Sequence, residues 1–294
     1  MLRFERIDEL RDWLRSPGRK GRRIGFVPTM GALHEGHLSL VRACGELCDD
    51  VVVSIFVNPL QFGPSEDFDR YPRDVEADLS KLEAAGAGVV FSPDVPEMYP
   101  QVSGTSVHPG PAAERWEGAL RPGHFAGVLT IVAKLFNIVE PDVALFGQKD
   151  YQQAVLVKWM VRDLNLAVRI EVLPTVRDHD GLALSSRNSY LSRDSRAAAA
   201  SIPRALATMR RIWRAGERGS DVLLSAGRSV LHEGGVQSID YLAVVHPDTL
   251  EPVSVAAPAS VVLAAVRVGS TRLIDNTVLD DQPDTPLDRA LIER

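Results

Sequence analysis

Short, almost uninterrupted apolar runs that alternate with amphipathic helical patterns constrain the fold of this chain more than any other feature. Residues 50–57 are nearly all Val, Ile or Phe, which is typical of a strand buried on both faces of a parallel sheet. Similar short runs predict strands at 24–28, 89–92, 143–146 and 168–172, with helices predicted at 7–15, 38–48, 74–85, 127–139 and 152–164. Strands and helices in this alternation form βαβ units. We therefore predict an α/β fold, a Rossmann-like doubly wound parallel sheet.

The pattern changes after Tyr190, where the strict alternation stops. Helices are expected at 195–215 and 220–231, followed by strands at 238–245, 260–268 and 271–274. This succession is typical of an α+β domain. We expect residues 1–175 to form the Rossmann-like domain and residues 176–294 a smaller C-terminal α+β domain, which begins with a lid loop.

The composition excludes several classes of protein. The chain has 294 residues, of which 45% are hydrophobic and 24% charged, as in ordinary globular proteins. Its net charge of −6 argues against a nucleic-acid-binding role. No apolar segment is long enough to span a bilayer, and two cysteines exclude a disulfide framework. We expect a soluble, cytoplasmic protein that binds neither membranes nor nucleic acid.

Four polar loops follow predicted strands, at residues 28–37, 58–63, 147–153 and 175–187. In doubly wound sheets, ligands bind at the carboxyl ends of the strands. We therefore expect these loops to build one site.

The first of these loops carries His34 and His37 at a strand-to-helix junction. A helix N-terminus presents unpaired N–H groups that suit a phosphate, and imidazoles there can donate hydrogen bonds to it. Gly31 and Gly36 let the backbone approach a ligand closely. The alternative is that one histidine only caps the helix and the other has no role.

The other loops also offer groups that could bind substrate. The amides of Asn58 and Gln61 could hold a carboxylate without an ion pair, although Asn-Pro also starts ordinary turns. Lys149 could neutralise phosphate, and Asp150 could bind a ribose hydroxyl or cap the next helix. A cluster of two hydroxyls and a guanidinium suits triphosphate oxygens, or is a solvated turn: Ser185, Ser186 and Arg187. Four acidic residues invite a metal interpretation: Asp67, Asp69, Asp74 and Asp78. Mg²⁺ that arrives with a nucleoside triphosphate is held largely by phosphates and water, and a helix N-terminus rich in Asp explains Asp74 as well or better, so we assign no protein metal ligand.

Five segments share a family resemblance. They read PTMGALHEGH at 28–37, FVNPLQFG at 56–63, RPGHF at 121–125, FGQKDYQQ at 146–153 and LSSRN at 184–188. In this order they resemble the pantothenate synthetases, members of the HxGH nucleotidylyltransferase superfamily. The likeness extends from about residue 27 to residue 192. It departs from the family at Gln148, where Glu is common, and we expect that position to offer backbone contacts only.

The resemblance implies an ATP-dependent condensation of pantoate with β-alanine to pantothenate, via a pantoyl adenylate, with release of pyrophosphate and AMP. It also implies Mg²⁺ bound with ATP and a homodimer. The catalytic residues would be His34, His37, Lys149 and Arg187. Gln61, Gln153 and Asn58 would bind pantoate and Gln61 also β-alanine, with Arg121 and His124 as supports behind them. The ATP-binding residues would be Met30, Gly31, Ala32, Leu33, His34, Glu35, Gly36, His37, Gly147, Gln148, Lys149, Asp150, Val176, Leu184, Ser185, Ser186 and Arg187.

Three other functions compete with this one. A different adenylyltransferase would explain HxGH but not the amides at 58, 61 and 153. An RNA-binding protein descended from a synthetase conflicts with the acidic net charge. A nucleotide-binding regulatory module without turnover is separated from an enzyme only by an assay.

Overall fold

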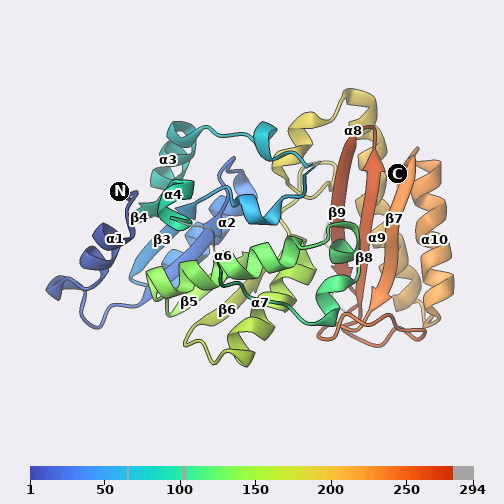
Figure 1. Cartoon of the computed structure of the whole chain (residues 1–294). Helices are drawn as coiled ribbons and strands as arrows, with labels where there is room; N and C mark the ends of the chain where they lie inside the picture. Colours follow the sequence, from blue (N-terminus) through green and yellow to red (C-terminus); the bar gives the residue numbers. More distant parts are fainter. Residues whose placement is uncertain (65, 101–103, 281–294) are drawn as a thin grey trace. The chain divides into compact units, whose positions relative to one another are not determined.

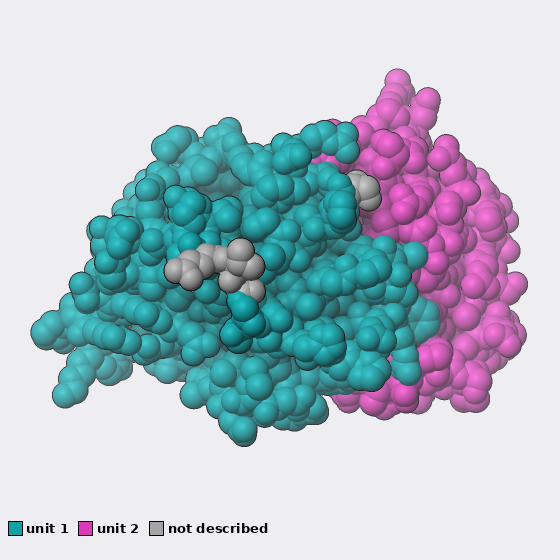
Figure 2. All heavy atoms as spheres, viewed as in Figure 1, with its two compact units in different colours: residues 1–148, 152–174 teal, residues 149–151, 175–294 magenta. Residues whose placement is uncertain are grey.

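The computed structural model describes residues 1–64, 66–100 and 104–280. The chain forms two compact units, coloured separately in Figure 2. Unit 1 consists of residues 1–148 and 152–174, and unit 2 consists of residues 149–151 and the chain from residue 175 onward. The sequence pattern did not indicate that residues 149–151 belong with the second unit. The end of the predicted C-terminal domain, 281–294, lies outside the described residues.

Unit 1 is built on a six-stranded sheet in which every pair of neighbouring strands is parallel (Figure 1). In space the order is β1-β4-β3-β2-β5-β6. The strands are β1 (Leu2–Phe4), β2 (Ile24–Thr29), β3 (Asp50–Ile55), β4 (Val89–Phe91), β5 (Val143–Gly147) and β6 (Arg169–Leu173). The predicted Rossmann-like fold is confirmed. Strand β1 was missed because its three residues are mostly exposed and carry no apolar pattern.

Helices cover both faces of this sheet, because successive strand residues point to opposite sides. Phe26 packs into one core with α1, α6 and α7, whereas its neighbour Val27 packs into the other core with α2 and α3. The helices are α1 (Ile7–Leu14), α2 (Glu35–Leu47), α3 (Val75–Ala84), α4 (Val95–Met98), α5 (Glu117–Leu120), α6 (His124–Val139) and α7 (Tyr151–Asp163).

Strands β2 and β5 are neighbours in the middle of the sheet. Chain progression reverses between them, since β3 and β4 lie beyond β2 whereas β6 lies beyond β5. This is the topological switch point at which α/β sheets bind ligands. The HxGH loop leaves the sheet at Thr29 and the GQKD segment leaves it at Gly147.

Unit 2 contains an antiparallel sheet of β7 (Ser238–Val245), β8 (Val261–Val268) and β9 (Thr271–Val278). Helices α9 (Ser201–Arg214) and α10 (Ser220–Glu233) pack against each other and against β9 and β7, around the fully buried Trp213 (Figure 1).

One predicted helix of unit 2 is corrected by the structure. Residues 195–215 form two helices, α8 (Arg193–Ala199) and α9, and not one. Pro203 has no N–H to donate to Ala199, and its ring would clash with that carbonyl in a continuous helix. The proline therefore stands in the first turn of a new helix.

Within the described residues, no helix has the length and apolar character needed to cross a membrane.

Candidate active site

The loop after β2 has an unusual backbone that is held by one buried carboxylate. Gly31 and Ala32 both have positive φ, 77° and 51°. Asp78, on α3, accepts hydrogen bonds from the N–H groups of Ala32 and Leu33, both at 2.8 Å. A Cβ at position 31 would lie 3.0 Å from Asp78 Oδ2, so glycine is needed there for space as well as for conformation. This role of Asp78 was not predicted, because an acidic residue in a first helical turn is ordinary.

His34 and His37 cap α2 reciprocally. The Gly36 N–H donates to His34 Nδ1 at 3.2 Å, and the His34 N–H donates to His37 Nδ1 at 3.4 Å. The two rings lie 4.1 Å apart between centroids. The capping alternative is therefore true of both histidines and not of one.

The capping hydrogen bonds also determine which nitrogen of each neutral ring carries the proton. A neutral imidazole whose Nδ1 accepts a hydrogen bond carries its proton on Nε2. In the neutral form, His34 and His37 thus each carry the ring proton on Nε2. The cap and a phosphate-binding role are compatible, because they use opposite nitrogens of the same ring.

The loop after β3 holds a buried amide pair. Asn58 donates to Gln61 Oε1 and to the Gly127 carbonyl, both at 3.1 Å, and its Oδ1 accepts from Tyr99 Oη at 2.9 Å. Gln61 Nε2 lies 2.9 Å from Met30 Sδ, which joins this loop to the HxGH loop. Asn58 is saturated by protein groups, whereas Gln61 faces a weak sulfur acceptor that a ligand oxygen could replace.

Gly127 makes this arrangement possible by its lack of a side chain. A Cβ at position 127 would lie 2.1 Å from the Leu60 carbonyl oxygen. Only glycine lets α6 approach the turn that carries Gln61 so closely.

Arg121 and His124 hold this same loop from behind. Arg121 binds Glu66 through two hydrogen bonds of 2.6 Å and the Gln61 carbonyl through one of 3.2 Å. His124 Nδ1 lies 2.8 Å from the Gln61 carbonyl and its Nε2 lies 3.1 Å from Arg121 Nη1. A carbonyl can only accept, so Nδ1 carries the proton and Nε2 accepts from the guanidinium. Burial next to Arg121 lowers the pKa of His124 to about 4, which keeps the ring neutral.

The two adjacent glutamines on α7 differ in role. Gln152 is buried and binds the carbonyls of Ala112 and Arg115 and the N–H of Glu117, which fixes the segment before α5. Gln153 is half-buried. Of the two, Gln153 is therefore the better candidate for a substrate contact.

Gly147, the last residue of β5, and Gln148 belong to unit 1, and unit 2 carries Lys149, Asp150, Val176 and residues 184–187. Lys149 and Asp150 lie in a short 3₁₀ turn, with Lys149 Nζ 3.8 Å from Asp150 Oδ1. Ser185 caps the 3₁₀ helix Ser186–Tyr190 by accepting from the Arg187 N–H at 3.3 Å. The Leu184 N–H donates to the Val176 carbonyl at 3.0 Å and so closes a hairpin. The SSRN segment follows directly after this hairpin.

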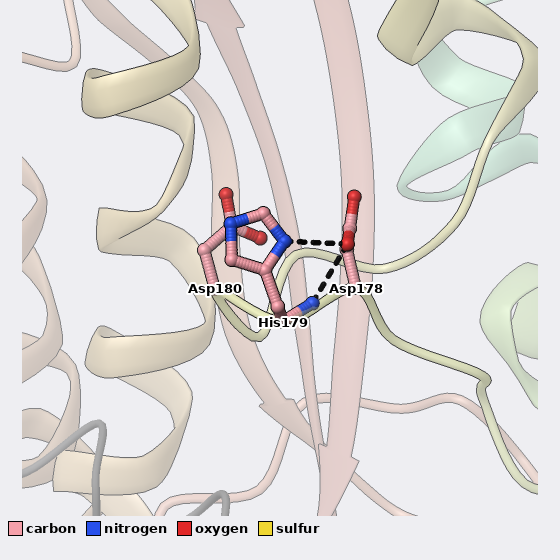
Figure 3. Close-up of side chains that lie close together, drawn as sticks. All are labelled: Asp178, His179 and Asp180. Carbon is pink, nitrogen blue, oxygen red and sulfur yellow. Dashed lines mark hydrogen bonds and ion pairs between the residues drawn. The ribbon is translucent and has the colours of Figure 1, made fainter.

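One acidic cluster in unit 2 invites a metal interpretation, Asp178 with His179 and Asp180 (Figure 3). Arg196 donates to both carboxylates at 2.7 Å, and His179 Nδ1 lies 2.7 Å from Asp178 Oδ1. These bonds lower the pKa of Asp178, the Arg196 bond most of all. The guanidinium of Arg196 already binds both carboxylates, so the cluster fits an ion-paired link within the hairpin better than a metal cage.

Unit 1 thus contains two contact groups: His34 with His37 at the start of α2, and Gln61 with Met30, Asn58, Arg121 and His124. Met30 and His34 belong to the same loop between β2 and α2, and His37 lies in the first turn of α2. Unit 2 separately brings together the hairpin that starts at Val176 and the Ser185–Arg187 turn. Sequence reasoning missed Asp78 and Glu66, whose partners are distant in sequence.

A doubly wound parallel sheet with an HxGH helix cap at its switch point defines an α/β protein of the nucleotidylyltransferase type. The family model described as pantoate-beta-alanine ligase matches residues 3–278. The chain belongs to the pantoate–β-alanine ligase family and is a ligase.

Named relatives agree over nearly the whole chain. Pantothenate synthetase from a Thermoanaerobacter species is 48% identical over 94% of this chain and 98% of its own length. That of Chloroflexus aurantiacus is 54% identical over 88% and 92%. A crystal structure of the Thermus thermophilus enzyme matches with a TM-score of 0.91 and 48% identity, over 95% of this chain and all of that one. The Francisella tularensis ligase, crystallised with an ATP compound and β-alanine, matches at 0.78 and 33%, over 97% and 100%.

Proposed function

We propose that this ligase condenses pantoate with β-alanine in two steps, through a pantoyl adenylate, and releases pyrophosphate and then AMP. The observation that carries the proposal is that one loop, between β2 and α2, is connected to two kinds of group. The imidazole pair at its α2 end suits phosphate, and the Gln61 amide, which contacts Met30 of this loop, suits a carboxylate. Family membership supports the same reaction.

In the first step the pantoate carboxylate attacks the α-phosphorus of ATP and pyrophosphate leaves. A carboxylate is already a nucleophile, so the protein needs no general base here and acts by positioning and charge stabilisation. The Nε2–H groups of His34 and His37 donate to phosphate oxygens. Lys149 and Arg187 neutralise the charge that develops on the leaving pyrophosphate.

In the second step the amine of β-alanine attacks the acyl carbon, AMP leaves, and the new amide nitrogen loses a proton. Gln61 and Gln153 hold the pantoyl group, and Gln61 also meets β-alanine. Asn58, Arg121 and His124 act through Gln61 by fixing its position. The lid loop from Val176 to Arg187 keeps water from the mixed anhydride.

The backbone contacts to ATP would come from residues 30–37, 147–150, Val176 and 184–187. Mg²⁺ is expected to arrive with ATP, bound mainly by phosphates and water. A homodimer in the cytoplasm completes the proposal. Light scattering of the purified protein tests the dimer, since a monomer mass would remove that part.

The deciding experiment is pantoate-dependent exchange of labelled pyrophosphate into ATP without β-alanine. We expect exchange only with pantoate, and AMP release only after β-alanine is added. Exchange supported instead by a phosphorylated cofactor precursor would identify a different adenylyltransferase. Nucleotide binding without exchange would identify a regulatory module.

A substitution of Gln61 tests how pantoate is recognised. Gln61→Ala removes one hydrogen bond to a charged group, which corresponds to a rise of about ten- to hundredfold in the KM for pantoate. The KM for ATP should stay nearly unchanged. Gln237→Ala, an exposed glutamine in unit 2, serves as the control. Equal losses for ATP and pantoate would contradict a specific role for Gln61.

A further inference from the structure

Two adjacent residues near the end of β9 are both buried although they are polar. Asp275 and Asn276 interrupt the alternating burial of this strand. A buried carboxylate is costly unless it is paired and fully hydrogen-bonded. Such a dipeptide on an edge strand therefore needs specific partners, and its partners prove to be the two phosphate-binding segments proposed for unit 2.

Asp275 binds the base of the lid hairpin. Its two carboxylate oxygens accept from Arg177 Nη1 at 2.6 Å and Nη2 at 3.0 Å. The same guanidinium donates to the Gly181 carbonyl at 3.1 Å, across the hairpin, and to the Asn276 carbonyl at 3.3 Å. The forked guanidinium of Arg177 therefore attaches the hairpin to β9. This hairpin leads directly into Ser185 and Arg187.

Asn276 binds the other segment. Its Nδ2 donates to the Lys149 carbonyl at 2.9 Å, 127 residues away in sequence. Its backbone N–H donates to Asp275 Oδ1 at 2.8 Å, so the Asp275 carboxylate also holds the Asn276 backbone. Lys149 lies between β5 and α7, yet its backbone is held by a strand near the far end of the chain.

We infer that Asp275 and Asn276 are positioning residues that set Lys149 and the Ser185–Arg187 turn at a fixed separation for the triphosphate. They act through the Lys149 backbone and through Arg177. This inference rests on the proposed function, because it assumes that Lys149 and Arg187 meet ATP. A displacement of about 1 Å in such groups can lower a rate by two orders of magnitude.

The test compares Asn276→Ala and Asn276→Asp with Asp240→Asn. Asp240 accepts from Arg267 and Arg272 within the same sheet, through bonds of 3.2 and 2.6 Å, and serves as the matched polar control on β7. Melting temperatures measure any structural loss. In pantoate-dependent exchange, we expect the Asn276 variants to lose about tenfold or more in kcat with little change in the KM for pantoate. Asp240→Asn should keep its kcat at a comparable melting temperature.

A double-mutant cycle separates positioning from stability. If Asn276 acts through Lys149, then Asn276→Ala should cost little more once Lys149→Ala has removed the side chain that it positions. Full additivity, or an equal kcat loss in Asp240→Asn, would overturn the inference. If the Asn276 variants fail to fold, Arg177→Lys keeps the charge but loses the fork, and a normal kcat in that variant would also overturn it.

The two proposals fail in different ways. If the wild-type protein shows no pantoate-dependent exchange, the proposed function is wrong whatever the variants do. If the wild type exchanges and Lys149→Ala is much slower, but folded Asn276→Ala behaves as wild type, only the positioning role is wrong.

Discussion

His34 and His37 are helix caps, and the proposed function gives the same two rings a role in the chemistry. Each uses Nδ1 to satisfy a backbone N–H at the start of α2. In the neutral form, the proton of each ring then lies on Nε2. Alanine substitutions at these positions would therefore mix two effects, the loss of a cap and the loss of the proposed phosphate contact.

Substitutions that keep the cap separate these effects. Asparagine is a strong N-cap residue, and glutamine at the third helical position completes a capping box. We expect His34→Asn and His37→Gln to keep the wild-type melting temperature within a few degrees but to lose most pantoate-dependent exchange. Calorimetry and the exchange assay check this. Near-normal exchange in folded His37→Gln would remove its catalytic role.

His124 predicts a pH dependence of stability. Its folded pKa of about 4 lies below its ordinary value of 6.5 because burial disfavours the charged ring. The unfolded chain therefore binds the proton first as the pH falls. The contribution of the neutral ring is complete above pH 6.5 and is lost as the pH falls toward 4.

Urea unfolding at pH 7 and pH 5 measures this contribution. We expect the wild type to lose about 2 kcal/mol more than His124→Gln over this interval. The glutamine amide can donate to the Gln61 carbonyl and accept from Arg121 without titrating. Equal pH dependence in the two proteins would contradict the assignment.

At the scale of elements, helix α3 shapes the loop that α2 begins from. Asp78 reaches across from α3 to two backbone N–H groups, and Lys81 on the same helix donates to the Leu33 carbonyl at 2.8 Å. The positive φ values of Gly31 and Ala32 persist because these bonds hold them. The conformation of the HxGH loop therefore depends on the two helices α2 and α3 and not on the loop's own sequence alone.

Asp78→Asn tests this link. The amide keeps one acceptor oxygen and turns its NH₂ toward a backbone N–H. We expect about 1–3 kcal/mol of destabilisation and a raised KM for ATP, measured by denaturant unfolding and by the exchange assay. Asp74→Asn is the matched control on α3, because asparagine replaces aspartate well at an N-cap. A normal KM for ATP in Asp78→Asn would show that the loop keeps its shape without the carboxylate.

The elements themselves could largely be predicted from the sequence, because periodicity reports burial. Val51 to Phe56 indicate a doubly buried strand whatever lies elsewhere. The predicted elements were wrong or missing where the sequence has no hydrophobic periodicity, as in β1. They were also wrong where one residue outweighs the periodic pattern, as Pro203 does between α8 and α9. The candidate site residues within the motifs were predicted for a different reason, because the motif sequences are specific to one family.

At the scale of the whole molecule, the residues that hold the site could not be predicted. Asp78, Glu66 and Asn276 lie far in sequence from the groups they bind, and their own neighbourhoods carry no chemical pattern. Contacts of this kind depend on the strand order and on which side chains share a face. A single sequence indicates where the strands lie, but it does not indicate which distant residues bind each other.

A chelator test also belongs to the whole molecule. Both carboxylates of the Asp178–Asp180 cluster are already bound by Arg196, so we expect EDTA to leave the melting temperature of the ATP-free protein unchanged. It should stop pantoate-dependent exchange, and added Mg²⁺ should restore it. A lower melting temperature in EDTA would point to a structural metal.

The bond between Asn276 and the Lys149 carbonyl also has a consequence for biosynthesis. Ribosomes add about 5–20 residues per second, so the 127 residues between these two positions take roughly 6–25 s to make. All six strands of the parallel sheet are translated before that interval ends. A nascent chain can therefore complete its first sheet while Lys149 still lacks its anchor, and the Lys149 backbone is held in place only after β9 has been made.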